Sequence, residues 1–257
     1  MIISYGTIHL TDIVNAQMRL YKKLGIKNAV AVIGGSMGGM QALCYAIEHP
    51  TFAKHYIPMA TTAYTRPWAI ALNKIAIEAI RHDPNFQNGN YEKDDLKARG
   101  LVGLAVGRMA GLIAYLSPNL FINKFGRDYV ETDGLYELFG RFEIEKYLEH
   151  NSYSFPKFFD PLSYLYICKT INIFDAGRNK DKLEDSFLKI EGKLHLIAFK
   201  DDMLFFPNEM EEIRDIMIKI GKKDQVTFKL VDSSSGHDSF LVEVEKFEEH
   251  IKDILKD

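Results

Sequence analysis

The sequence predicts an α/β fold built on a mostly parallel sheet, with a helical insertion in the middle of the chain. Short apolar runs alternate with helical patterns over the first 60 residues, and the same alternation returns after residue 190. Between them, residues 67–178 show helical segments separated by polar or Pro/Gly-rich joints and no strand–helix alternation. We therefore expect a core of residues 1–66 and 179–257, and a helical lid of residues 67–178.

Each element is placed by its apolar periodicity and by residues that start or stop helices. Thr11 or Asp12 can cap a first helix that ends before Gly25, and Pro50 follows the end of the second. The expected strands are residues 28–33, 55–60, 193–199 and 226–231. The expected helices are residues 12–24, 40–48, 68–81, 94–116, 141–150, 161–174, 208–220 and 239–255.

Composition bounds the class of protein. A chain of 257 residues suffices for one large α/β domain, and a net charge of −3 argues against nucleic-acid binding. The two cysteines, Cys44 and Cys168, are too few for a disulfide framework and fit a reduced, cytoplasmic compartment. No apolar run approaches the length of a membrane span, and the first residues lack the features of a signal peptide. We expect a cytoplasmic protein that binds neither nucleic acid nor membrane.

One short motif carries most of the chemistry. The expected first strand leads into Gly34-Gly35-Ser36-Met37-Gly38, and a helical pattern follows. This G-x-S-x-G in a strand–turn–helix context resembles the nucleophile elbow of α/β-hydrolases. Glycines suit the tight turn because neighbouring side chains would clash there, and the free N–H groups of the following helix can stabilise an oxyanion. Glycine-rich turns of this kind also bind phosphate, which is the alternative interpretation.

A serine nucleophile needs a base and an orienting acid, which α/β-hydrolases supply in the order Ser, acid, His after successive strands. His237 follows the last expected strand and is the best base, because the other histidines lie near termini, at helix ends or in strands. Asp201 and Asp202 both follow the third expected strand and compete for the acid role. Either aspartate can instead be a solvated turn residue or a helix cap.

A more specific resemblance covers nearly the whole chain. The segment 34–43 closely resembles the nucleophile segment of homoserine O-acetyltransferases. Further blocks that match this family are residues 12–17, 79–84, 89–91, 107–109, 115–117, 124–127, 142–148, 159–165, 202–205 and 236–241.

The resemblance implies a role for each matching residue. Ser36 would accept the acetyl group, with Asp202 as the triad acid, His237 as the base and the Met37 N–H as an oxyanion donor.

Three further residues match the family's acceptor site. Arg108 and Tyr115 would bind homoserine, with the arginine paired to its carboxylate. Asp238 would pair with its α-amine. Without the resemblance, Arg108 reads as a solvated charge, Tyr115 as core packing and Asp238 as a helix N-cap.

The implied reaction is acetyl transfer from acetyl-CoA to L-homoserine in methionine biosynthesis, with no bound cofactor and no metal. The resemblance also implies a homodimer formed through the lid helices. Family members carry roughly a hundred residues before the point that matches Met1, a length that corresponds to the first strands and a second oxyanion donor. We therefore expect the N-terminal strands to be missing from this chain. Alternatives are a serine hydrolase or esterase of the same fold, an inactive truncated homologue, a succinyl donor, or serine as acceptor.

Overall fold

The computed structural model describes residues 6–92, 101–131, 137–178 and 180–256. The chain divides into two compact units, one containing Pro67–Lys169 and the other made of Ile8–Arg66 with Thr170–Asp257. The first is helical and the second contains the sheet. The assignment of residues 67–178 as a lid stays a prediction.

The sheet has four parallel strands in the order β1-β2-β3-β4. The strands are β1 (Ala29–Gly35), β2 (Ala53–Met59), β3 (Lys193–Phe199) and β4 (Val226–Val231). The two central strands are buried almost throughout, as is typical of a parallel sheet covered on both faces. β1 lies at one edge of the described sheet, where Val30 is 59% and Ile33 is 43% exposed. The parallel α/β sheet expected from the sequence is confirmed.

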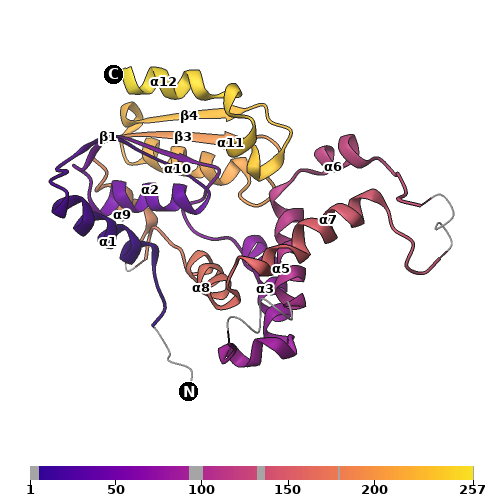
Figure 1. The fold of residues 1–257 in the computed structure, drawn as a ribbon. Helices are drawn as coiled ribbons and strands as arrows, with labels where there is room; N and C mark the ends of the chain where they lie inside the picture. The colour runs from indigo at the N-terminus through magenta and orange to yellow at the C-terminus, as the bar shows by residue number, and fades with distance from the viewer. Residues whose placement is uncertain (1–5, 93–100, 132–136, 179, 257) are drawn as a thin grey trace. The chain divides into compact units, whose positions relative to one another are not determined.

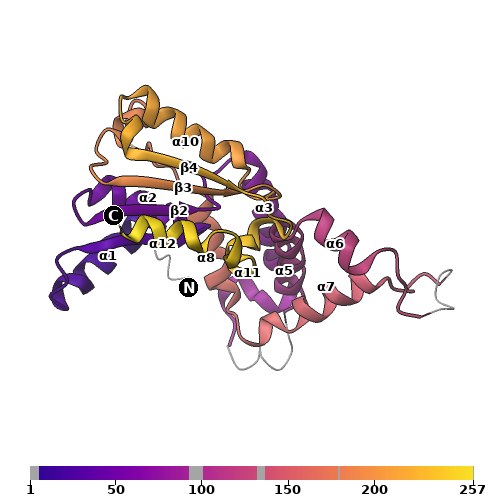
Figure 2. The same ribbon diagram turned by 90° about the horizontal axis from the view of Figure 1, so that it is seen from above.

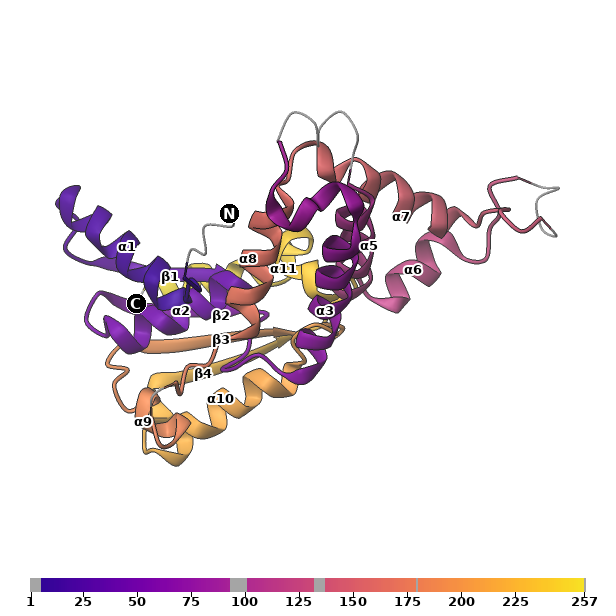
Figure 3. The same cartoon turned by 90° about the horizontal axis from the view of Figure 1, so that it is seen from below.

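Helices cover both faces of this sheet. Figure 1 shows α12 (Glu248–Lys256) above the strands, with α2 (Met37–Glu48) and α10 (Pro207–Lys219) below them. The view from above has α12 in front of the sheet (Figure 2), and the view from below has α2 and α10 in front (Figure 3). The remaining helical segments of this unit are α1 (Leu10–Lys23), α9 (Leu183–Phe187), η4 (Lys223–Gln225), η5 (Gly236–Asp238), α11 (Ser239–Val242) and η6 (Val244–Lys246).

The core under α12 joins the sheet to the end of the chain. Ile57 and Ile197 of the central strands are fully buried there, and Phe247 and Ile254 pack against the same cluster. The ring of Phe247 meets that of Phe199 edge to face, with centroids 5.4 Å apart. This packing anchors the segment that follows β4.

The helical unit has a core of its own, formed by Ile80, Phe86, Leu101 and Leu104. Its elements are α3 (Pro67–His82), η1 (Pro84–Gly89), α5 (Val102–Tyr115), α6 (Pro118–Phe125), α7 (Glu143–Tyr153) and η3 (Phe155–Lys157), followed by α8 (Pro161–Asn172), which runs across the boundary between the units.

Three expectations about helices are corrected. The single helix expected over 239–255 is broken into α11, η6 and α12, because Glu243 and Phe247 turn inward and are buried. The first helix begins at Leu10, since the Asp12 carboxylate reaches back to the His9 N–H at 2.9 Å instead of starting the helix. The helix after Ser36 begins at Met37, three residues earlier than expected. The expected start of helix 94–116 lies outside the described residues.

Candidate active site

Ser36 lies on a strained turn between β1 and α2. Its φ of 56° and ψ of −121° are unusual for a residue with a side chain. The Ser36 N–H donates to the Met59 carbonyl at 2.9 Å, and the Ser36 carbonyl accepts from the Thr61 hydroxyl at 2.9 Å and from the Met40 N–H at 3.1 Å. These hydrogen bonds fix the backbone of Ser36 at the carboxyl end of β1, which is where a nucleophile elbow places its serine.

Two glycines make this turn sterically feasible. A Cβ on Gly34 would lie 2.3 Å from the Gly38 carbonyl oxygen, and a Cβ on Gly35 would lie 2.3 Å from the ring of Phe240. Gly38, the second glycine of the motif, has nothing within 4 Å of its would-be Cβ. The expectation that neighbouring glycines avoid clashes thus applies to Gly34 and Gly35, and space does not require it at Gly38.

Met37 is the first residue of α2. The first N–H groups of an α-helix have no partner within the helix and sit at its positive dipole end. The Met37 backbone is therefore in a position to donate to negative charge that develops next to Ser36.

Asp202 lies in the turn after β3, where its side chain is buried. One carboxylate oxygen, Oδ1, accepts from the N–H groups of Leu204 at 2.9 Å and Phe205 at 3.0 Å. The other, Oδ2, lies 2.8 Å from Nδ1 of His237. Of the two competing aspartates, Asp202 is thus the one whose carboxylate meets the histidine.

His237 follows β4 and is 2% exposed. A carboxylate accepts hydrogen bonds, so the Asp202 oxygen next to Nδ1 assigns the proton of the imidazole to Nδ1. The basic lone pair is then on Nε2. The rings of Phe205 and Phe240 meet the imidazole edge to face, at centroid distances of 5.4 and 5.7 Å. Phe240 also lies against Gly35, so the same ring contacts the histidine and the residue before Ser36.

Glu243 fixes the loop that leads to His237. Its carboxylate accepts from the N–H groups of Ser234 at 3.1 Å and Ser235 at 3.3 Å, and from the Ser234 hydroxyl at 2.9 Å. Lys246 donates to it at 2.7 Å. Burial acts to raise the pKa of Glu243, but the hydrogen bonds from Lys246 and Ser234 outweigh burial and lower the pKa to about 2. No local pattern in the sequence points to Glu243, because its partner Ser234 lies nine positions earlier.

A second buried carboxylate, Glu209, lies in the field of Asp202. Burial raises the pKa of Glu209, and the charge of Asp202 acts in the same direction, while Thr62, the Phe206 N–H and Arg66 oppose them. The Arg66 Nε lies 3.8 Å from Glu209, beyond hydrogen-bond distance.

The residues expected to bind the acceptor fall in both units. Asp238 directly follows His237 and is half-buried at the start of α11. Arg108 and Tyr115 belong to α5 in the helical unit, where the structure brings them together. The Arg108 guanidinium lies 5.6 Å from the centre of the Tyr115 ring and 5.0 Å from that of Phe155. The two residues therefore share one face of α5.

No group of three or more His, Cys, Asp or Glu side chains that could hold a metal ion occurs among the described residues. Within the same residues no single helix is long and apolar enough to cross a membrane. The helices α5 and α6, which are bent by 100° relative to each other, reach that length and apolar composition only when they are taken together.

Comparisons with known proteins agree with this geometry. The model of the α/β-hydrolase fold family matches residues 3–244. Homoserine O-acetyltransferases from Nautilia profundicola and Sulfurimonas autotrophica are 53% and 52% identical to this chain over 99% and 98% of its length. The chain spans 68% of each of these relatives, or about two thirds of their length.

Solved structures give the same fold. A homoserine O-acetyltransferase from Bacillus anthracis superposes with a TM-score of 0.90 at 22% identity, covering 99% of this chain and 67% of that one. Esterase E22 superposes with a TM-score of 0.87 at 25% identity, covering 98% and 68%. A strained serine elbow, a buried Asp–His pair in the matching order and relatives of this identity lead to one conclusion: the chain belongs to the α/β-hydrolase fold family and, within it, to the homoserine O-acetyltransferases.

Proposed function

We propose that this protein transfers an acetyl group from acetyl-CoA, through an acyl-Ser36 intermediate, to the side-chain hydroxyl of L-homoserine. The observation that carries the proposal is the 2.8 Å contact between Asp202 and Nδ1 of His237, in the same compact unit as the serine elbow. That arrangement suits acyl transfer through a serine, and the name of the relatives supplies the acceptor and the acetyl group.

In the first half-reaction, His237 Nε2 takes the proton of the Ser36 hydroxyl as its oxygen attacks the thioester carbon of acetyl-CoA. The Met37 N–H donates to the oxyanion of the tetrahedral intermediate. When the carbon–sulfur bond breaks, the imidazolium returns its proton to the leaving thiolate. Asp202 stabilises the imidazolium throughout and holds the ring in the required tautomer.

The second half-reaction runs the same chemistry with homoserine as the nucleophile. His237 takes the proton of the homoserine hydroxyl, whose oxygen attacks the acetyl carbon of acyl-Ser36. The bond to Ser36 breaks and the serine oxygen recovers the proton, so O-acetylhomoserine leaves and the enzyme is regenerated. No bound cofactor is needed, because acetyl-CoA is a co-substrate.

Acceptor recognition is assigned to three residues by the family resemblance. The Arg108 guanidinium suits a carboxylate in a bidentate geometry, with Tyr115 beside it on the same helix face. Asp238, adjacent to the base, suits the α-ammonium of homoserine. We further propose a cytoplasmic homodimer formed through helices of residues 67–178, which light scattering after size-exclusion chromatography would test.

An esterase is the second candidate, favoured by the likeness to esterase E22. The two activities share Ser36, Asp202 and His237, and differ in whether water or an amino acid accepts the acyl group. Acetylation alone therefore does not separate them, whereas dependence on the acceptor does.

The decisive experiment follows acetyl-CoA with and without L-homoserine. Intact mass should show one added acetyl group on the protein and none on Ser36→Ala, and CoA release should rise strongly when homoserine is added. Release that is independent of homoserine would favour the esterase, and the absence of a Ser36 adduct would favour an inactive homologue. Parallel reactions with succinyl-CoA and with L-serine identify the preferred donor and acceptor.

A further inference from the structure

A cavity lies on the unit that contains the sheet, at the end of α2 opposite to Ser36. Its volume is about 380 Å³, which is within the range of small-molecule sites. It is bordered by the last turns of α2, the start of α1 and residues of 170–178 and 180–186, all within one compact unit. Leu10, Ile47 and Phe174 give it apolar walls. The cavity is therefore concave, partly apolar and separate from the elbow.

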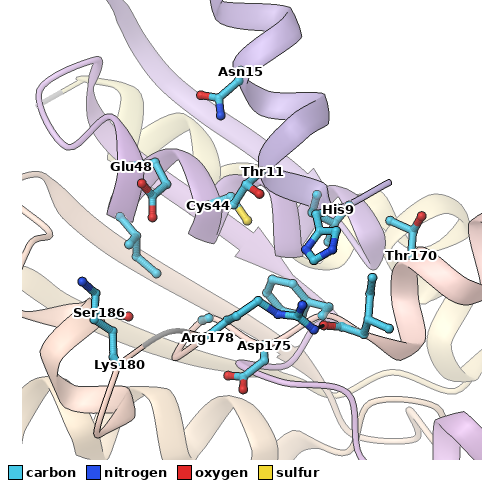
Figure 4. Close-up of a pocket in the computed structure, with 15 residues that line it drawn as sticks. His9, Thr11, Asn15, Cys44, Glu48, Thr170, Asp175, Arg178, Lys180 and Ser186 are labelled. Atoms are coloured by element: carbon cyan, nitrogen blue, oxygen red, sulfur yellow. Dashed lines mark hydrogen bonds between the residues drawn. The ribbon is translucent and has the colours of Figure 1, made fainter. Parts of the chain in front are cut away.

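Charged groups of both signs surround the cavity. Figure 4 shows the Glu48 carboxylate and the Cys44 thiol pointing from α2 into the space that Arg178 borders on the opposite side. Lys180 and Asp175 also line it. The Arg178 side chain is held in place by its hydrogen bond to the Ile173 carbonyl, at 2.8 Å.

These opposite charges do not neutralise one another. Within the described part of the chain, no ion pair joins Glu48 or Asp175 to Arg178 or Lys180. One oxygen of Asp175 accepts from the Gly177 N–H at 2.8 Å, and neither Glu48 nor Lys180 has a side-chain hydrogen bond to a described residue. Glu48 and Arg178 therefore border the cavity from opposite sides, and Asp175 lies on the same side as Arg178.

We propose that this cavity binds a zwitterionic α-amino acid with an apolar side chain. The ligand carboxylate pairs with Arg178, since a guanidinium matches a carboxylate in a bidentate geometry, and Lys180 adds positive charge. The ligand ammonium pairs with Glu48. The apolar side chain lies against the walls formed by Ile47 and Phe174. A molecule that lacks either charge leaves one side of the cavity unpaired, so the site discriminates by the pair of charges.

Cys44 contributes to this site as a neutral wall. Burial, with the nearby charge of Glu48, raises the pKa of the Cys44 thiol to about 12. The thiol thus remains protonated at neutral pH, so the cavity binds its ligand without forming a bond to sulfur. Since α2 has 12 residues, its two ends are separated by about 18 Å, and the cavity is distinct from the elbow.

Calorimetry with matched ligands and variants tests the proposal. The probes are L-valine, L-leucine, L-isoleucine and L-phenylalanine at millimolar concentrations. For leucine, the amine 3-methylbutylamine lacks the carboxylate and 4-methylpentanoate lacks the ammonium. We expect at least one amino acid to bind, and each single-charge analogue to bind about tenfold more weakly or worse, as for the loss of one charged hydrogen bond.

The variants locate the binding. Glu48→Gln and Arg178→Gln should each weaken it about tenfold, whereas Glu249→Gln and Arg81→Gln, which change the same charges at exposed positions elsewhere, should not. Binding that survives both cavity variants but is lost in Arg108→Gln would belong to the acceptor position and would overturn the proposal. So would the failure of all four amino acids to bind. Acetylation of Ser36 is measured separately, so neither result depends on the proposed function.

Discussion

Glu243 holds Ser234 at two points, with its carboxylate 3.1 Å from the backbone N–H and 2.9 Å from the hydroxyl oxygen. This clamp lies three residues before His237 and closes the loop in which the base must be placed. Because a base works only within hydrogen-bond reach of its proton, a loose loop would reduce turnover without touching the substrate.

Replacing this carboxylate should therefore slow catalysis. Glu243→Gln keeps the shape but turns an amide towards N–H donors, so one or more charged hydrogen bonds are lost. We expect kcat to fall about tenfold with KM little changed. Steady-state kinetics and hydrogen exchange of the 233–236 loop measure both effects. Glu245→Gln, at an exposed neighbouring position, is the control, and equal kcat values for the two variants would show that the clamp does not position His237.

Acid stability should carry the signature of the same residue. The pKa of Glu243 is about 2 in the folded protein, against 4.5 for a free side chain, so the folded state binds fewer protons at intermediate pH. The resulting stabilisation is complete above about pH 5 and is lost as pH falls towards 2, with a size of roughly 3 kcal/mol. Urea unfolding across this range should show a shallower decline for Glu243→Gln than for the original protein. Parallel declines would mean that other carboxylates dominate.

Asp202 should matter far more than its neighbour. Asp202→Asn retains the shape but favours the wrong tautomer of His237, a change that lowers kcat by about 10⁴ in serine proteases. We expect a loss of similar order in the rate of Ser36 acetylation. That rate is measured by quenching the reaction at short times and determining the intact mass of the protein. Asp201→Asn, which changes the same charge one residue earlier, should cost far less. A larger loss for Asp201→Asn would reverse the assignment of the acid.

The two motif glycines should respond oppositely to alanine. Gly34→Ala places a Cβ 2.3 Å from the Gly38 carbonyl oxygen, and such overpacking costs about 1–3 kcal/mol. Gly38→Ala meets no atom within 4 Å and lies in the first turn of α2, where alanine is favoured by up to about 1 kcal/mol. Thermal unfolding of the two variants compares them directly. A destabilised Gly38→Ala would contradict the open space that the structure gives this glycine.

The strain at Ser36 should be measurable as stability. Ser36→Gly removes the Cβ that opposes a φ of 56°, whereas Ser36→Ala keeps it, and both variants lack the nucleophile. We expect the glycine variant to be more stable than the alanine variant by roughly 1 kcal/mol, after allowing for the greater flexibility of unfolded glycine. Urea titration of the pair provides the value. Greater stability of Ser36→Ala would show that the turn is relaxed.

The four strands and their parallel pairing follow from local patterns in the sequence, whereas the order of the strands in the sheet does not. Apolar runs such as residues 193–199 predicted strands correctly, and the elbow motif predicted the turn at Ser36. Local pattern does not separate Asp201 from Asp202, because both follow the same strand. The family resemblance favours Asp202, and in the structure the Asp202 carboxylate lies 2.8 Å from Nδ1 of His237.

Other features depend on contacts between distant residues. Nothing local indicates that Glu243 turns inward to meet Ser234, so the apolar pattern predicts a continuous helix over 239–255, and this prediction is wrong. The short helix α6 was missed although Ser117 and Pro118 form a standard start signal, with the Ser117 hydroxyl accepting from the Leu120 N–H at 3.0 Å.

The edge position of β1 has a consequence for handling the protein. A strand that ends the described sheet and exposes Val30 and Ile33 offers another extended polypeptide a template for pairing. Self-association should therefore increase with protein concentration more steeply than a net charge of −3 would suggest. Val30→Lys should reduce this self-association, because a charged side chain at an exposed edge disfavours pairing with another strand.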